Sequence, residues 1–445
     1  MTHAIYEEKA DRFSLNVPPT DLPRVVIVGG GFAGLQVAKR LQKTKCQVVM
    51  IDRHNYHTFQ PLLYQIATGG LEPNSIASPL RKLLHHNHYY FRVAEAEAVE
   101  PSTQMLRTSI GRIRYDHLVL AYGSQTTFFG MDDVERNAIP MKTIPNALDL
   151  RSYILQNLEQ AVIKNNPIKR QEFTNFVIAG GGPTGVELAG AMAELKRFVV
   201  KNDYPEINHD EIEIYLVEMA DRLLPAMSEQ ASQKAHEYLE EFGVNIILNN
   251  GVKSYDGDYV RFFDQSSILS NTLIWAAGVE VKPLSGLPSS SVNPRGRIKV
   301  NSYHQVHGFD RIYALGDIAY METDLYPNGH PQLAPVAIQQ GRSLGKNLVK
   351  KIKNTKKQPR SFEFEDPGVM ATIGRNRAVV DLKHLKLQGV FAWFLWMFAH
   401  IMYIIGFRNK LIVFFDWVYN YLTYDRATRL IIRPYRRQSK KKGAL

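Results

Sequence analysis

The residues best suited to do chemistry lie in a glycine-rich segment near the start of the chain. Gly29, Gly31 and Gly34 form a Gly-x-Gly-x-x-Gly pattern, and Asp52 follows the last glycine by 18 residues. Glycines at this spacing let backbone N–H groups approach a pyrophosphate at a helix N-terminus, and an acid at the next strand end can bind ribose hydroxyls. A tight turn would explain the glycines alone, but the added acid favours a dinucleotide site.

The same pattern returns about one domain length later. Gly180, Gly182 and Gly185 repeat the triplet, and Glu218 follows by 33 residues, more than the usual spacing of about 20. A polar insertion at 201–211 accounts for the extra length. A carboxylate there repels the 2′-phosphate of NADPH and so favours NADH, whereas the alternative is a solvated acid at a strand end. Two dinucleotide sites favour a relay in which a nicotinamide delivers hydride to a flavin.

Apolar runs place both triplets in the order strand, turn, helix, strand. This order is typical of a parallel, buried sheet with helices on its faces. The sequence therefore predicts an α/β fold with two Rossmann-like dinucleotide-binding domains. The predicted elements are strand 25–28, helix 35–43, strand 47–51, strand 173–179, helix 186–200, strand 212–217, strand 311–317 and helix 334–353.

A single cysteine among 445 residues limits the redox chemistry that the chain can perform. Cys46 has no second thiol for a disulfide, a catalytic thiol pair or an all-cysteine metal site. We expect it to be a packed hydrophobic side chain. His85, His86 and His88 could suggest metal ligands, but no acid or thiol cluster accompanies them, so no metal site is predicted.

The net charge of +11 is concentrated near the C-terminus, where residues 386–445 hold eleven basic and two acidic residues. Within this segment, residues 387–407 carry no formal charge when His400 is neutral. At about 1.5 Å per residue they could just cross a hydrocarbon core of about 30 Å. Frequent Trp and Tyr and the flanking basic residues instead favour two helices lying in the membrane surface, attracted to anionic lipid. A buried dimer interface is a compatible alternative, and nucleic-acid binding is not favoured.

Several motifs together resemble one family. The two glycine turns, Trp275-Ala-Ala-Gly278, Tyr313-Ala-Leu-Gly-Asp317 and Phe59-Gln-Pro-Leu-Leu-Tyr-Gln-Ile-Ala-Thr68 resemble type II NADH dehydrogenases. These are single-subunit, non-pumping NADH:quinone oxidoreductases of the two-dinucleotide-binding flavoprotein superfamily. Over residues 22–434 the resemblance implies tightly bound FAD, NADH as substrate, a membrane quinone as acceptor and monotopic membrane binding. We further expect a homodimer and a location on the cytoplasmic face of the cell membrane. The lone cysteine excludes the disulfide reductases and sulfide:quinone oxidoreductases of this superfamily.

The resemblance also implies roles for individual residues. FAD would contact Gly29, Gly31, Ala33, Gly34, Asp52, Arg53, Pro61, Leu62, Ala121, Gly123, Asp317 and Ala337, and NADH would contact Gly180, Gly182, Gly185, Glu218 and Gly278. Glu187 matches a family glutamate beside the flavin that could donate a proton to the quinone, although a solvated first-turn acid is an equal alternative. Gln339 keeps the second glutamine of the family's quinone motif, but Pro335 replaces the first and puts quinone affinity or type in doubt. His57 is expected to flank the flavin or its loop.

The resemblance divides the chain into functional regions. They are an N-terminal arm at 1–20, an FAD-binding domain at 21–145 and 286–355, an NADH-binding domain at 146–285, and a helical membrane-association region at 356–445. Two other functions are weighed: a reductase of a soluble electron carrier such as a ferredoxin, and a non-catalytic membrane-associated NADH sensor. The reductase predicts a hydrophilic C-terminus, which the sequence lacks. The sensor is compatible with Pro335, which replaces a glutamine of the quinone motif.

Overall fold

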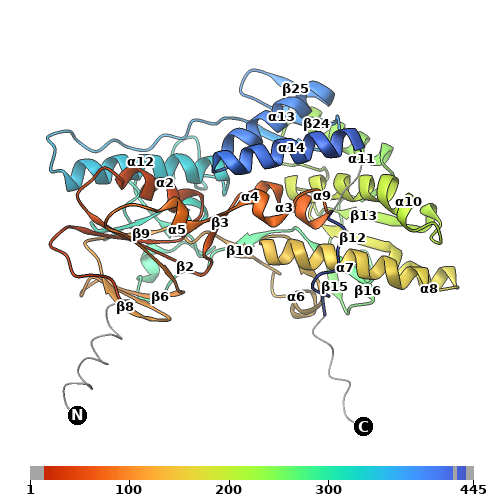
Figure 1. Ribbon diagram of the computed structural model, residues 1–445, viewed down its shortest axis with the longest axis horizontal. Helices are drawn as coiled ribbons and strands as arrows, with labels where there is room; N and C mark the ends of the chain where they lie inside the picture. Colours follow the sequence, from red (N-terminus) through yellow and green to blue (C-terminus); the bar gives the residue numbers. More distant parts are fainter. Residues whose placement is uncertain (1–14, 424–427, 437–445) are drawn as a thin grey trace, which may run out of the picture. The chain divides into compact units, whose positions relative to one another are not determined.

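The computed structural model describes residues 15–423 and 428–436 (Figure 1). Most of the predicted N-terminal arm and the basic residues Arg426, Arg437 and Lys440–Lys442 lie outside this range. The chain forms two compact units. Unit 1 comprises residues 1–58, 78–125 and 279–366, and unit 2 comprises residues 59–77, 126–278 and 367–445. The functional regions expected from the sequence divide the chain at other positions and stay predictions.

Unit 1 is built on a parallel five-stranded sheet in the order β21-β9-β1-β2-β5. Its strands are β1 (Arg24–Val28), β2 (Gln47–Asp52), β5 (Tyr89–Val93), β9 (His117–Leu120) and β21 (Ile312–Ala314). The central strands β1, β2 and β9 are almost entirely buried, as expected for apolar runs covered on both faces. Helices α2 (Phe32–Leu41) and α12 (Ala334–Ile352) pack against each other.

Shorter elements complete unit 1. They are β3 (Tyr56–Thr58), α5 (Leu80–Leu83), β6 (Ala96–Glu100), β7 (Met105–Thr108), β8 (Gly111–Arg114), β19 (Val279–Glu280), η4 (Ser289–Ser291), β20 (Ile298–Lys299), η5 (Gly316–Ile318) and β22 (Ala319–Tyr320), while β4 (Ala77–Pro79) and β10 (Gln125–Thr126) lie where the chain passes from one unit to the other.

Unit 2 contains a second parallel five-stranded sheet, in the order β11-β18-β12-β13-β14. Its strands are β11 (Ile139–Pro140), β12 (Asn175–Ala179), β13 (Glu213–Val217), β14 (Val244–Ile247) and β18 (Thr272–Trp275), and an antiparallel sheet of β15 (Val252–Tyr255), β16 (Tyr259–Phe262) and β17 (Ser267–Leu269) follows β14 in the chain. The two sheets confirm the predicted repeat of Rossmann-like openings. In detail, β12 starts at Asn175 rather than at 173, because helix α8 extends to Thr174.

The helices of unit 2 precede and follow these strands. They are η1 (Gln60–Leu62), α3 (Leu63–Ala67), α4 (Pro73–Ile76), α6 (Asp132–Asn137), α7 (Ile144–Val162), α8 (Pro167–Thr174), α9 (Pro183–Glu194), η2 (Leu195–Val200), α10 (Lys201–Asp203), η3 (His209–Glu211) and α11 (Glu229–Glu241). The predicted helix 186–200 begins three residues earlier, at Pro183, whose fixed φ suits the first helical turn. It continues past Glu194 as the π-helical segment η2.

The C-terminal part of unit 2 consists of a small sheet and two helices. Strands β23 (Val369–Thr372), β24 (Ala378–Asp381) and β25 (Lys386–Gln388) form an antiparallel sheet. The helices α13 (Gly389–Tyr403) and α14 (Phe407–Thr423) run side by side (Figure 1). Gly406 has φ +90° between them, a conformation that favours glycine, so the apolar segment breaks there. Within residues 15–423 and 428–436, no helix combines the length and apolar character needed to cross a bilayer.

Candidate functional site

The first glycine turn has the shape that a dinucleotide pyrophosphate requires. A Cβ on Gly29 (φ +105°) would lie 2.2 Å from the Ala121 carbonyl oxygen, and a Cβ on Gly34 would lie 2.0 Å from the Gly29 oxygen, so both positions need glycine. A Cβ on Gly31, by contrast, would have no described atom within 4 Å, and no described side chain caps the N-terminus of α2. A helix N-terminus without a side-chain cap, beside open space, fits an anionic group.

Asp52 is fastened against this turn at the end of β2. Its Oδ2 accepts a hydrogen bond from Gly30 N at 2.6 Å, and its Oδ1 accepts one from His54 N at 2.7 Å. His57 also contacts the turn, since its Nδ1 lies 3.0 Å from the Gly30 oxygen. Burial lowers the pKa of His57 to about 4, so the ring is neutral and Nδ1 is the donor. The exposed Arg53 follows Asp52 directly.

The second turn repeats this arrangement at the atomic level. Gly180 (φ +109°) lies against the Ala276 carbonyl, and a Cβ on Gly185 would lie 1.8 Å from the Gly180 oxygen. Gly182 again faces space free of described atoms at the uncapped start of α9. Glu218 accepts hydrogen bonds from Gly181 N at 2.6 Å and Ala220 N at 2.8 Å. Glu218 is therefore held against its glycine turn and is not a freely solvated acid.

A second turn lies beside each triplet. In unit 1, β9 leads into Ala121, Tyr122 and Gly123, with Gly123 at φ +74°. In unit 2, β18 leads into a matching turn that ends at Gly278, with φ +73°. The structure thus places the predicted residues of these turns at equivalent positions in the two sheets.

Asp317 lies in a turn that several side chains hold. The Ser124 hydroxyl donates to the Asp317 carboxylate at 2.5 Å, and Gln332 Nε2 donates to the Asp317 backbone oxygen at 3.1 Å. Gly316 precedes Asp317 with φ +71°, and a Cβ on it would lie 3.4 Å from the Ala337 side chain on α12. Unit 1 therefore brings Asp317 and Ala337 together, and its open turn at Gly31 and its Asp52 carboxylate fit the pyrophosphate and the adenosine ribose of a dinucleotide.

Gln339 makes two hydrogen bonds with the chain that follows α12. Its Nε2 donates to the Glu365 oxygen at 2.7 Å, and its Oε1 accepts from Glu365 N at 3.0 Å. To bind a quinone carbonyl, the Gln339 amide would have to leave Glu365. Its role as a quinone ligand stays a prediction.

Glu187 is buried in unit 2, with 6% of its surface exposed. Burial raises its pKa to about 8, partly offset by a backbone hydrogen bond from Thr372 and by the indole N–H of Trp396. The Trp396 contact is loose, because Nε1 has no partner at full hydrogen-bond geometry. The alternative of a solvated first-turn acid is wrong, and the carboxyl is predominantly protonated near neutral pH.

An aromatic pocket of about 110 Å³ adjoins these residues in unit 2. Thr372 and Trp396 line it together with Ala191, one helical turn after Glu187. Its other lining residues are Tyr64, Gln65, Thr68, Gly70, Glu194, Phe198, Gly374, Arg375, Trp393, Met397, Trp417, Asn420 and Tyr421. In the same unit, Pro61 and the fully buried Leu62 lie in the η1 turn that precedes α3.

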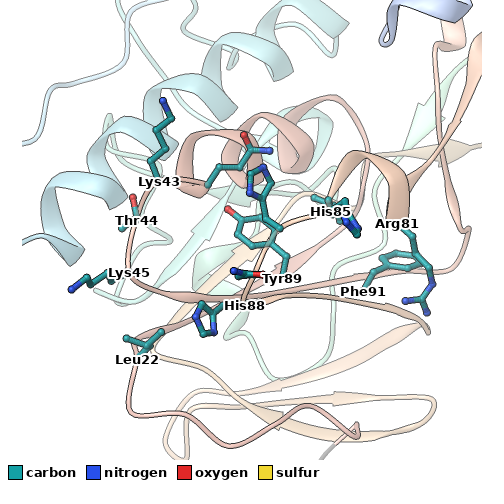
Figure 2. Close-up of a pocket in the computed structure, with 13 residues that line it drawn as sticks. Leu22, Lys43, Thr44, Lys45, Arg81, His85, His88, Tyr89 and Phe91 are labelled. Atoms are coloured by element: carbon teal, nitrogen blue, oxygen red, sulfur yellow. The ribbon is translucent and has the colours of Figure 1, made fainter.

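A larger cleft of about 900 Å³ lies in unit 1, at the amino ends of β2 and β5 (Figure 2). The glycine turn and Asp52 occupy the carboxyl ends of the sheet, so this cleft is not part of the dinucleotide site. Figure 2 shows His85 and His88 spread along it rather than converging. No group of three His, Cys, Asp or Glu side chains in the described part of the chain could hold a metal ion. The exposed cations Lys43 and Arg81 complement the nearby C-terminal ends of α2 and α5.

Comparison with known proteins decides the family. Residues 23–341 match the pyridine nucleotide-disulphide oxidoreductase family, and residues 367–424 match the NDH2 C-terminal domain. The type II NADH:quinone oxidoreductase NdhA of Mycobacterium tuberculosis is 32% identical over 425 residues, which cover 92% of this chain and 89% of the relative. The chain belongs to the type II NADH:quinone oxidoreductases. The expected family is therefore confirmed, and neither a soluble-carrier reductase nor a non-catalytic sensor is supported.

Further comparisons agree with this membership. An internal alternative NAD(P)H-ubiquinone oxidoreductase of Arabidopsis thaliana is 28% identical and covers 89% of this enzyme and 83% of the relative. NDH2 from Plasmodium falciparum shares the fold, with a TM-score of 0.84 at 21% identity over 92% of this chain and all of that one. A sulfide:quinone oxidoreductase of Aquifex aeolicus also shares the fold, with a TM-score of 0.68 at 19% identity over 91% and 96%. Cys46, the enzyme's one cysteine, is buried as expected.

Some residues around these sites carry no motif in the sequence. Ser124 and Gln340 contact the Gly316–Asp317 turn, and Thr372 and Trp396 surround Glu187. Trp396 lies in a uniformly apolar run, so its sequence position gives no sign of a carboxyl partner. Gln340 stands beside the motif glutamine, and only the direction of its side chain distinguishes the two.

Proposed function

We propose that unit 1 binds FAD, that the second glycine turn binds NADH, and that the quinone binds in unit 2 beside Glu187. Family membership makes the enzyme a flavin-dependent NADH:quinone oxidoreductase that does not pump protons. When bound, FAD accepts hydride from NADH and passes two electrons to a quinone. The chain's own residues bind and orient FAD, NADH and the quinone and exclude water from them. One residue also supplies a proton to the quinone.

The FAD assignment is supported by the first turn. Open space at Gly31 and the uncapped N-terminus of α2 suit the pyrophosphate, while Asp52 keeps lone pairs for ribose hydroxyls. Asp317, steadied by Ser124, would bind the ribityl side directly or through water. Ala33, Gly123 and Ala337 supply close backbone or small side-chain surfaces in the same unit.

The NADH assignment is supported by the second turn. Gly182 opens the start of α9 to a pyrophosphate, and the Glu218 carboxylate stands where the adenosine ribose would bind. Because that carboxylate is fixed by two backbone N–H groups, it cannot turn away from a 2′-phosphate. NADH is therefore the preferred substrate.

Glu187 is the proposed proton donor to the quinone. Reduction of a quinone to a quinol consumes two electrons and two protons, and a buried carboxyl with a pKa of about 8 carries a proton at neutral pH. The Thr372 N–H and the Trp396 indole would stabilise the carboxylate left after donation. The aromatic pocket beside these residues is of the kind that suits a flat quinone ring.

Helix α14 supports attachment to a lipid surface, because several of its polar groups bond inward while its outward face is apolar. Asn409 donates to the Ala77 oxygen at 2.9 Å, Trp417 Nε1 to Gln65 at 2.7 Å, and Asn420 to the Gly70 oxygen at 3.0 Å. The opposite face exposes apolar side chains, which are Phe407, Leu411, Phe414, Phe415, Val418 and Leu422. So large an exposed apolar face is unfavourable in water and favourable against hydrocarbon.

Helix α13 extends the apolar surface. Phe391, Phe394 and Phe398 are 81%, 55% and 64% exposed at helical spacing. We propose that this surface lies on the cytoplasmic face of the cell membrane and gives the quinone a path from lipid into the aromatic pocket. As an alternative, a second copy of the chain would cover this surface in a homodimer.

Matched glycine variants test the assignment of the cofactors. Gly31 and Gly182 have φ near −72° and −73° and face open space, so valine is compatible with both backbones. G31V should be purified without flavin absorbance. G182V should keep FAD, whose absorbance dithionite still bleaches anaerobically, but NADH should no longer bleach it. Equal bleaching of G182V and wild type by NADH would contradict the proposal, as would full flavin content in G31V.

A further inference from the structure

Two neighbouring glutamines on α12 serve different parts of unit 1. Gln339 is partly exposed, and its amide bonds the backbone of Glu365. Gln340 is 1% exposed, and its Oε1 accepts a hydrogen bond from Gly316 N at 2.7 Å. Successive helical residues differ in direction by about 100°, so the two amides cannot work on the same side of the helix.

The Gly316 peptide is part of the turn that presents Asp317. Its φ of +71° is readily adopted by glycine, whose backbone is also the most flexible, so contacts from neighbouring residues fix the conformation of this peptide. Gln340 bonds the turn at Gly316 N, while Ser124 bonds the Asp317 carboxylate and Gln332 bonds the Asp317 oxygen. The turn is thus held at three separate atoms.

Close packing between α12 and α2 fixes the position of Gln340. The next residue is Gly341, where a Cβ would lie only 2.3 Å from the Ala33 oxygen. One turn later, a Cβ on Gly345 would lie 2.7 Å from the Arg40 side chain. Because α2 begins at the first glycine turn, α12 connects that turn with the Gly316–Asp317 turn through direct contacts.

We propose that Gln340 is a positioning residue for FAD, which holds the Gly316–Asp317 turn so that the Asp317 carboxylate keeps its orientation toward the cofactor. The inference rests on the proposed role of Asp317 in FAD binding. Glutamine suits this position because its neutral amide accepts a hydrogen bond without placing a second negative charge beside Asp317. Gln339 hydrogen-bonds to the backbone of Glu365 and takes no part in holding the Gly316–Asp317 turn.

The neighbouring glutamines provide a matched pair of variants, Q340M and Q339M, which exchange an amide for an apolar side chain of similar size. Release of FAD from the purified holoenzyme after dilution is followed by the fluorescence of free flavin. Q340M should release FAD at least about tenfold faster than wild type, the effect of one lost buried hydrogen bond. Q339M should stay within about twofold of wild type. Equal release from Q340M and wild type would overturn the inference, as would equally fast release from both variants.

Hydrogen exchange separates positioning from a general loss of stability. In the holoenzyme, the peptide covering residues 312–320 should exchange faster in Q340M than in Q339M, while peptides from β1 and β2 should exchange equally in both. Uniformly faster exchange in Q340M would mean a merely structural role and contradict the inference. If Q340M does not fold, Q340N, whose shorter amide cannot reach Gly316, gives the same comparison with Q339N as its control.

A third variant distinguishes this inference from the function on which it rests. D317A removes the proposed FAD contact itself. If D317A keeps FAD as long as wild type, the assignment of Asp317 fails. If D317A loses FAD quickly and Q340M does not, only the role of Gln340 fails.

Discussion

At the scale of single residues, Asp52 and Glu218 hold their glycine turns through the same pair of backbone contacts. Each carboxylate accepts one hydrogen bond from the residue after the first glycine of its triplet and one from the residue two positions after itself. The internal repeat therefore extends from the order of elements to individual atoms. A carboxylate held in this way is a fixed negative charge.

The charge of Glu218 should decide between NADH and NADPH. E218Q removes the charge while keeping a side chain of the same shape, so repulsion of a 2′-phosphate disappears. The ratio of kcat/KM for NADPH to that for NADH should rise at least about tenfold, or about 1.4 kcal/mol. E213Q, an acid at the opposite end of β13, is the control and should leave the ratio unchanged. An unaltered ratio in E218Q would assign the preference to other residues.

The raised pKa of Glu187 should make stability depend on pH. The folded carboxyl holds its proton up to about pH 8, whereas an unfolded one loses it near its ordinary value of 4.5. Unfolding therefore releases a proton between these values, and the free energy of unfolding falls as the pH rises through this window. E187Q cannot ionise, so its free energy of unfolding should not fall in this way. Between pH 5 and pH 8 the difference in free energy of unfolding, E187Q minus wild type, should rise by a few kcal/mol.

Urea unfolding of both proteins at pH 5 and pH 8 checks this difference. Parallel stability profiles would show that Glu187 is not protonated in the folded enzyme. The same variant should retain flavin reduction by NADH, because that step needs no carboxyl proton, and should lose quinone turnover.

At the scale of elements, α2 and α12 pack closely and connect the two turns that we propose to bind FAD. A Cβ on Gly341 would lie 2.3 Å from the Ala33 backbone oxygen, and a Cβ on Gly345 would lie 2.7 Å from the Cβ of Arg40. Neither atom can rotate away, because the Arg40 Cβ is bonded directly to the backbone. An added methyl group at either glycine would therefore push α12 away from α2.

These contacts predict the outcome of two alanine substitutions. G341A should destabilise the holoenzyme by several kcal/mol and lower its FAD content, since α12 must shift away from α2. G345A should also destabilise it, but by less, because its closest contact would be 2.7 Å rather than 2.3 Å and because alanine favours the helix. Thermal unfolding and the ratio of flavin to protein measure both effects. Wild-type stability of G341A would contradict the close backbone contact.

The apolar face of α13 is the element expected to bind lipid. Exposed Phe391, Phe394 and Phe398 would each contribute about 1.5–3 kcal/mol when buried in lipid. Replacing all three by serine should weaken binding to lipid vesicles at least about a hundredfold while NADH still bleaches the flavin. I163S/I168S, which alters apolar residues exposed to 66% and 69% elsewhere in unit 2, is the control. Undiminished vesicle flotation of the triple variant would point to a dimer interface instead.

At the scale of the whole molecule, the basic C-terminal segment is only partly available to lipid. Arg429 pairs with Asp203 at 3.0 Å, and Arg433 pairs with Asp149. Both ion pairs lie within unit 2. They neutralise positive charges that the sequence alone predicts to attract anionic lipid. The exposed apolar helices should therefore supply most of the binding energy.

This balance predicts a modest effect of salt. Raising the ionic strength screens exposed charges but leaves apolar burial intact or stronger. Binding to vesicles that contain anionic lipid should weaken by less than about tenfold between low and high salt, and binding to neutral vesicles should persist. Complete release by salt would show that the basic residues, and not α13 and α14, hold the enzyme on the membrane.

The sequence by itself determined the two Rossmann-like openings, the strand-end acids and the family. These features depend on local rules: glycine is required where a Cβ would strike backbone, and apolar runs form buried parallel strands. Such rules act within a few residues, so Gly29, Asp52, Gly180 and Glu218 could be found without any structure.

The tertiary structure alone decided which polar groups meet. Gln339 hydrogen-bonds to the backbone of Glu365, and Gln340 hydrogen-bonds to Gly316, although the two glutamines are neighbours in the chain. It buried Glu187 beside Trp396, which lies more than 200 positions away. Burial and long-range contacts set the pKa of a carboxyl and the direction of an amide, and neither is encoded in the residues that surround it in the sequence.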